Sequence, residues 1–193
     1  GLDPETPTGL VLFGGEGSAR MVEIARGLEA VRRELQAIFI CGRNEELARW
    51  LRGAKRRYRF WVEGFTSEIP HYMQLADFFI GKPGPGSISE ALEMDLPVIV
   101  ELNARTMPQE RYNAQWIREL GLGIVVRSFG HIAEAVERLL GPENFERYRA
   151  AARGVENRAV FEIPEILEKV LRRGPLRSHP DGPGLSGQIR TRT

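Results

Sequence analysis

Short apolar runs alternate with longer amphipathic segments along most of this chain. The runs occupy residues 9–13, 37–40, 59–65, 77–81, 96–100 and 123–126. Between them, apolar residues recur at helical spacing, as Met21, Ile24 and Leu28 do. Strands that are apolar throughout and separated by helices indicate a parallel sheet covered on both faces. We therefore predict a doubly wound α/β domain with about six strands.

The two ends of the chain differ from this pattern. Pro4 and Pro7 discourage regular structure in residues 1–8, which we expect to be a linker remnant that follows an earlier part of the protein. Residues 173–193 are rich in glycine, proline, serine and arginine, and their composition predicts a disordered tail. Residues 9–172 then form the predicted domain, with Pro164 expected as the first residue of its last helix.

Charge and cysteine content narrow the classes of function. The 27 basic and 26 acidic residues give a net charge of +1, which gives no support to nucleic-acid binding. One cysteine, Cys41, cannot form an internal disulfide, which favours a reducing compartment such as the cytoplasm. No apolar run approaches the roughly 18 residues of a membrane span. No histidine pair has metal-ligand spacing, so we expect neither a metal nor another cofactor.

Glycine-rich turns follow several of the predicted strands. Ligands of such sheets bind beyond the carboxyl ends of the strands, so these turns should converge on one edge. At Gly84 and Gly86 the backbone can approach an anion closely, and the following helix offers unpaired N–H groups. Ser87 suits an N-cap, and Glu90 follows at the spacing of a capping box. From this spacing alone, Glu90 is equally a cap or a ligand for vicinal hydroxyls.

The glycine-rich loop that follows residues 9–13 is not a dinucleotide fingerprint. Arg20 stands where that motif requires its last glycine, and no acidic residue ends the second predicted strand. Gly17 and Ser18 could donate hydrogen bonds to a diphosphate, although an ordinary turn would have the same composition. No catalytic triad or close carboxylate pair stands out, so we expect binding groups and no catalytic base in this chain.

Taken in order, GGEGS at residue 14, the segment from Gly64 to Val100, and PQERYN at residue 108 resemble the C-terminal half of glycosyltransferase family 28. The resemblance covers residues 2–171 and is strongest to monogalactosyldiacylglycerol synthases and processive diacylglycerol glucosyltransferases. The peptidoglycan N-acetylglucosaminyltransferase is a more distant relative. Pro83 and residues 103–107 depart from the pattern of the lipid galactosyltransferases.

The resemblance implies one Rossmann-like half of a GT-B enzyme, which binds a UDP-sugar donor. An inverting transfer of a hexose to a lipid-type hydroxyl, diacylglycerol in the first place, would need an N-terminal acceptor half that also supplies the base. Peripheral contact with the cytoplasmic membrane face would come through that half. The implied donor contacts fall into four groups: diphosphate at Gly17, Ser18, Gly84, Gly86 and Ser87; uracil at Gly64 and Phe65; ribose at Glu90; and sugar at Gln109 and Glu110, with Asn113 nearby.

Two other functions remain open at this point. A UDP-sugar 2-epimerase has two similarly built halves, although this half lacks acid and base residues around the sugar. A stand-alone UDP-sugar sensor would need no second half. We expect the chain alone to bind UDP or UDP-sugars weakly and to transfer nothing.

Overall fold

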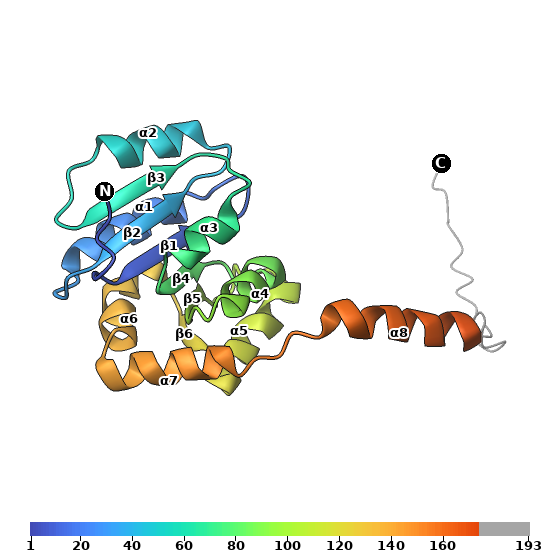
Figure 1. Ribbon diagram of the computed structural model, residues 1–193. Coiled ribbons are helices and arrows are strands. Elements are labelled where there is room, and N and C mark those ends of the chain that lie inside the picture. The colour runs from blue at the N-terminus through green and yellow to red at the C-terminus, as the bar shows by residue number, and fades with distance from the viewer. Residues whose placement is uncertain (174–193) are drawn as a thin grey trace, which may run out of the picture. The chain divides into compact units, whose positions relative to one another are not determined.

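The computed structural model describes residues 1–173 and divides the chain into two units, residues 1–156 and a second unit that begins at Asn157. The first unit alternates strands and helices (Figure 1). Its strands are β1 (Thr8–Leu12), β2 (Gln36–Ile40), β3 (Arg59–Glu63), β4 (Phe78–Gly81), β5 (Val98–Glu101) and β6 (Gly123–Val126). Its helices are α1 (Arg20–Gly27), η1 (Leu28–Ala30), α2 (Glu45–Gly53), α3 (Ile69–Gln74), α4 (Pro85–Glu93), α5 (Pro108–Leu120), η2 (Phe129–His131), α6 (Ile132–Leu139) and α7 (Pro142–Arg153).

All six strands are parallel and lie in the order β3-β2-β1-β4-β5-β6. The predicted doubly wound parallel sheet of six strands is therefore confirmed, with strand ends shifted by one or two residues. The order reverses at β1, which pairs with β2 on one side and β4 on the other. The loops after β1 and β4 consequently lie next to each other, at the point where sheets of this kind bind their ligands.

Helices cover both faces of the sheet (Figure 1), and one cluster of buried apolar side chains lies between the helices and each face. On one face, Ile24 of α1, Leu51 of α2 and Val136 of α6 are fully buried together with Phe39 and Phe78 of the sheet. On the other face, α3, α4 and α5 pack against alternate strand residues such as Leu10. Because both faces are covered, the strands need the continuous apolar runs that the sequence shows.

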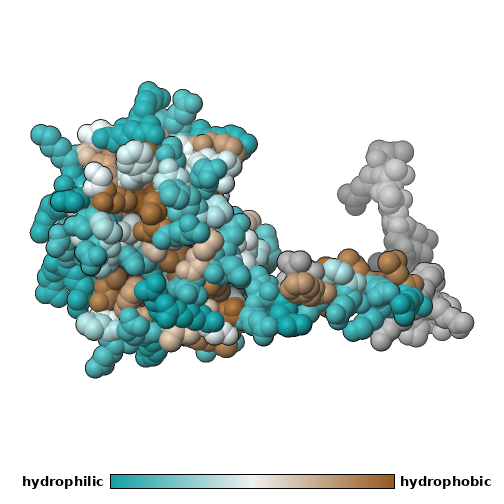
Figure 2. All heavy atoms as spheres, in the orientation of Figure 1, coloured by the Kyte–Doolittle hydropathy of each residue, from teal (hydrophilic) through white to brown (hydrophobic). Residues whose placement is uncertain are grey.

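The second unit contains α8 (Ala159–Arg173), a helix with several exposed apolar side chains. Figure 2 shows apolar residues gathered along one side of this helix. Six apolar side chains are exposed: Phe161, Ile163, Ile166, Leu167, Val170 and Leu171. Pro164 lies inside the helix, so the prediction that it begins the last helix is wrong. The helix begins earlier because the N–H groups of Phe161 and Glu162 already bond the Arg158 carbonyl.

The first predicted boundary separates a linker at residues 1–8 from the domain. In the structure Thr8 is already the first residue of β1, and its N–H donates to Asp77 Oδ2 at 2.8 Å. The predicted tail at 173–193 lies outside the described residues, apart from Arg173. The proposed limits of the linker and of the tail remain predictions.

Candidate functional site

Two cavities open at the carboxyl edge of the sheet, on either side of the loop after β1. The β1–β2 cavity, of about 250 Å³, is lined by Leu12, Gly14, Gly15, Ile40, Gly42, Phe65, Thr66, Ile69, Ser87 and Glu90. The β4–β5 cavity, of about 430 Å³, is lined by Phe13, Ser18, Arg20, Lys82, Pro83, Glu101, Arg105, Thr106, Met107, Glu110 and Phe129. The loop from Gly14 to Ser18 contributes to both cavities.

The structure brings five of the predicted donor contacts to these two cavities. Phe65, Ser87 and Glu90 line the β1–β2 cavity, while Ser18 and Glu110 line the β4–β5 cavity. The other six lie on the same turns and helix starts without lining either cavity: Gly17, Gly64, Gly84, Gly86, Gln109 and Asn113.

The turn before α4 excludes the capping-box interpretation of Glu90, while its role as a ligand stays a prediction. The N-cap of α4 is Gly84, and Ser87 lies inside the helix, so the predicted Ser87 cap is wrong. The reason is Pro85, whose fixed φ and missing N–H suit the first position of a helix. Glu90 is then one turn too far along to close a capping box. Glu90 is exposed and lines the β1–β2 cavity, and its carboxylate makes no hydrogen bond or ion pair within the described residues.

The loop after β1 is held close to the loop after β2. Gly17 has a φ of +63°, and a Cβ there would lie 2.5 Å from the Cys41 carbonyl oxygen, so only glycine fits. The Arg43 N–H donates to the Gly15 carbonyl at 2.8 Å. Ser18 Oγ accepts the Arg20 N–H at 3.2 Å as α1 begins. The loop therefore presents Ser18 at a fixed position on the rim of the β4–β5 cavity.

The turn after β3 is organised by the Glu63 carboxylate. It accepts the Tyr72 hydroxyl at 2.7 Å and the Gly64 N–H at 2.9 Å. The hydrogen bond from Tyr72, followed by that from Gly64, lowers the pKa of Glu63. Phe65 is 61% exposed, and the Arg43 guanidinium lies 4.4 Å from its ring centroid. The Gly64 N–H is thus already engaged, which leaves the Phe65 ring and backbone to face a ligand.

PQERYN forms the first turns of α5, and its three predicted residues have different surroundings. Glu110 is buried, with Oε1 3.1 Å from Lys82 Nζ. Asn113 Nδ2 donates to the Pro83 carbonyl at 2.9 Å, which ties α5 to the turn before α4. Gln109 is exposed, and its Nε2 lies 3.5 Å from Met107 Sδ. Asn113 therefore braces the glycine-rich turn instead of facing a cavity.

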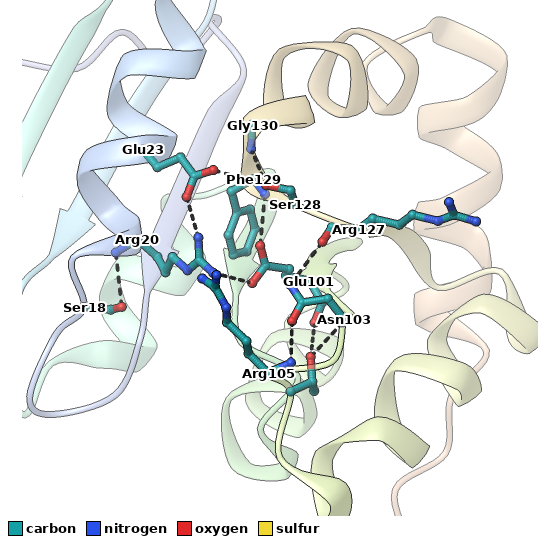
Figure 3. Close-up of polar contacts among 11 residues, drawn as sticks. Ser18, Arg20, Glu23, Glu101, Asn103, Arg105, Arg127, Ser128, Phe129 and Gly130 are labelled. Atoms are coloured by element: carbon teal, nitrogen blue, oxygen red, sulfur yellow. Dashed lines mark hydrogen bonds and ion pairs between the residues drawn. The ribbon is translucent and has the colours of Figure 1, made fainter.

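A network of charged and polar groups includes several residues that line the β4–β5 cavity (Figure 3). Arg20 Nη1 lies 2.7 Å from Glu23, and its Nη2 lies 3.5 Å from Glu101. Glu101 also accepts the Phe129 N–H at 3.2 Å, while Ser128 Oγ donates to Glu23 at 3.2 Å. These contacts join the first turn of α1 to the ends of β5 and β6.

Sequence reasoning missed Arg20, Lys82, Glu101 and Arg105 as cavity residues. Lys82 directly follows β4, and Glu101 ends β5. A charged residue next to a buried strand was the signal that could have singled them out. Among residues 1–173, no group of three or more His, Cys, Asp or Glu side chains is placed to hold a metal ion. In the same residues, no helix has the length and apolar character that crossing a bilayer requires.

Comparison with known proteins is consistent with this geometry. Residues 10–167 match the model of the glycosyltransferase family 28 C-terminal domain. This chain belongs to glycosyltransferase family 28. A probable monogalactosyldiacylglycerol synthase 3 of Oryza sativa is 33% identical over 181 residues, which are 89% of this chain and 35% of that protein. The spinach monogalactosyldiacylglycerol synthase is 32% identical over 182 residues, 89% of this chain and 34% of that protein. This family 28 chain thus spans about a third of the length of these relatives.

Solved structures give the fold of the family 28 domain. MurG of Acinetobacter baumannii superposes with a TM-score of 0.70 at 15% identity, over 86% of this chain and 50% of MurG. The calicheamicin glycosyltransferase CalG4 superposes with a TM-score of 0.64 at 19% identity, over 90% of this chain and 46% of CalG4. The domain therefore has the fold of one half of a GT-B glycosyltransferase.

Proposed function

We propose that this chain is the donor-binding half of an inverting UDP-sugar glycosyltransferase that transfers a hexose unit to a lipid-type hydroxyl. The observation that carries the proposal is Glu90, a carboxylate with no structural partner among the described residues, in a cavity at the switch point of the sheet. An unpaired carboxylate is a suitable acceptor for the two vicinal hydroxyls of a ribose.

The β1–β2 cavity has the chemistry of a nucleoside site. Leu12, Ile40 and Ile69 line it with apolar surface, and the exposed Phe65 ring offers a face on which a base can stack. Glu90 stands on the α4 side of the same cavity. Binding pockets of this kind combine apolar walls with a few polar groups that fix orientation.

The diphosphate would lie between the two cavities, over the Gly14–Ser18 loop and the start of α4. Gly86 lies in the first turn of α4, and a Cβ there would have no heavy atom within 4 Å, so its surroundings are open to a ligand. The unpaired N–H groups of this nine-residue helix favour an anion through its dipole. The same groups would stabilise UDP as the leaving group.

The sugar would then occupy the β4–β5 cavity, where Glu110 is fixed by Lys82. An acceptor hydroxyl oxygen would form a bond to the anomeric carbon as the bond to UDP breaks, with the electron pair leaving on the β-phosphate. The hydroxyl proton would pass to a base on an N-terminal half of the protein. The lipid acceptor rests on the names of the relatives, which are monogalactosyldiacylglycerol synthases.

Calorimetric titration of the 193-residue chain tests the proposal. UDP, UDP-glucose and UDP-galactose are expected to bind, and NAD is expected to give no heat beyond dilution. A transfer assay with diacylglycerol should show no product from this chain alone. Binding of NAD without binding of any uridine nucleotide would overturn the proposed function.

A further inference from the structure

One of the three cations that line the β4–β5 cavity has no carboxylate partner among the described residues. Three basic side chains line it, Arg20, Lys82 and Arg105, against two acidic ones, Glu101 and Glu110. Glu101 faces Arg20 at 3.5 Å, and Glu110 faces Lys82 at 3.1 Å. Arg20 also pairs with Glu23 at 2.7 Å, so two carboxylates share its guanidinium, and Arg105 is the lining cation without a carboxylate partner in residues 1–173.

The Arg105 guanidinium has no ion pair or hydrogen bond within residues 1–173. Only its backbone N–H is engaged, by Asn103 Oδ1 at 2.8 Å, which fixes the loop that carries it. Thr106 Oγ1 accepts the Asn103 N–H at 3.0 Å in the same loop. Figure 3 shows the Arg105 side chain extending toward the pair formed by Arg20 and Glu101. An arginine whose five donors have no partner among the described residues, in a cavity that Arg20 also lines, favours an anion as its ligand.

The position of Arg105 indicates which part of a donor its guanidinium would contact. The nucleoside cavity lies over β2 and β1, whereas Arg105 follows β5. In the order β2-β1-β4-β5, the end of β5 lies two strand spacings from β1 and three from β2, or about 10–14 Å. The diphosphate groups proposed above, at Ser18 and the start of α4, lie between these ends. The far end of a bound donor is its sugar.

Building on the proposed function, we infer that the donor sugar carries a carboxylate, as in a UDP-hexuronate such as UDP-glucuronate, and that Arg105 binds this group. A planar guanidinium matches a carboxylate in a bidentate arrangement, which a neutral hexose cannot offer at the same carbon. The ion pairs and hydrogen bonds around Arg20 and Glu101 hold the opposite wall of the cavity in place. Arg105 would therefore be the side chain that adjusts its position to bind the carboxylate.

The test measures the dissociation constants of UDP, UDP-glucose and UDP-glucuronate by calorimetry for the 193-residue chain and its Arg105→Ala, Arg105→Lys and Arg127→Ala variants. The unaltered chain is expected to bind UDP-glucuronate about tenfold more tightly than UDP-glucose, a modest value for a charged hydrogen bond because Arg105 is exposed. Arg105→Ala should remove this preference and leave UDP binding within about twofold. Arg105→Lys should keep part of the preference, because it retains charge without the bidentate geometry.

Arg127 is the matched control. It follows β6 at the same edge of the sheet, and Figure 3 shows its side chain pointing away from Arg20 and Glu101. Arg127→Ala removes the same charge, so it should keep the preference for UDP-glucuronate. Equal loss of preference in both alanine variants would assign the effect to the general field and overturn the inference.

Two further outcomes would refute it. If UDP-glucuronate binds no more tightly than UDP-glucose, Arg105 does not bind a carboxylate of the donor sugar. If Arg105→Ala weakens UDP itself as much as UDP-glucuronate, Arg105 holds the diphosphate. Either result leaves the proposed function standing. Failure of all three uridine ligands would instead refute the proposed function, and the inference with it.

Discussion

Replacing Glu90 with alanine is expected to weaken UDP binding while leaving the stability of the free domain unchanged. In the β1–β2 cavity, the carboxylate would accept hydrogen bonds from two ribose hydroxyls. Hydrogen bonds to charged groups contribute about 1.5–3 kcal/mol, so the dissociation constant should rise about 10- to 150-fold. Stability should not change, because Glu90 is exposed and caps nothing: the N-cap of α4 is Gly84.

Thermal unfolding with and without UDP separates these two effects. At UDP concentrations 100 times the original dissociation constant, binding stabilises the unaltered chain by about 2.7 kcal/mol. A 30-fold weaker variant would gain only about 0.9 kcal/mol under the same conditions. For a unit of this size, about 1 kcal/mol corresponds to roughly 2–4 °C in Tm. The UDP-induced shift should therefore fall from roughly 5–11 °C to about 2–4 °C.

Glu93→Ala is the matched control for this measurement. Glu93 is exposed on the same helix, lines neither cavity and forms no ion pair within the described residues. It should retain the full UDP-induced shift. The reasoning is refuted if Glu90→Ala binds UDP as tightly as the unaltered chain, or if its Tm without ligand falls by several degrees.

Three other outcomes are expected. Gly17→Ala should destabilise the domain by more than about 1 kcal/mol in urea unfolding, because its Cβ would meet the Cys41 carbonyl at 2.5 Å. Gly86→Ala should unfold normally and bind UDP more weakly in calorimetry. Equal stability of the two variants would contradict this expectation. Tyr72→Phe should cost about 1 kcal/mol or less at pH 7 in urea unfolding. The Tyr72 hydrogen bond lowers the folded-state pKa of Glu63. Its contribution to the free energy of unfolding is therefore present above the ordinary carboxyl pKa of about 4.5 and is lost as pH falls through the folded-state pKa. A loss of stability in Tyr72→Phe that does not depend on pH would contradict the assignment. Burial raises the pKa of Cys41 to about 11, so a thiol reagent at pH 8 should label it only as the chain unfolds, and rapid labelling of the native chain would contradict this.

The sheet could be predicted from the sequence because its signal is local. Continuous apolar runs such as residues 37–40 are buried on both faces, and their burial depends on little beyond their own composition. The positions at which the helices start depended on competing local signals. Ser87 suits an N-cap and Pro85 suits the first helical position, and the proline decided the outcome by starting the helix three residues earlier than a Ser87 cap would.

The site could be predicted in part, because residue type and spacing do not give side chain direction. Glu90 faces a cavity as expected, whereas Asn113 turns back to the Pro83 carbonyl. The pairing of Lys82 with Glu110 joins residues 28 positions apart in the chain, one directly after β4 and the other in the first turn of α5. Such pairings follow from the assembled fold and leave no periodic signal in the sequence.

The two cavities share the loop after β1 and the segment from Lys82 to Glu90, and otherwise draw on different segments of the chain. The β1–β2 cavity depends on the ends of β2 and β3, whereas the β4–β5 cavity depends on the segment between β5 and α5. Substitutions in residues 103–107 can therefore accumulate without disturbing the groups around Glu90. In evolution, such a division would let a lineage exchange one transferred sugar for another while it kept the same nucleotide carrier, and it makes that short segment the natural target for redesign.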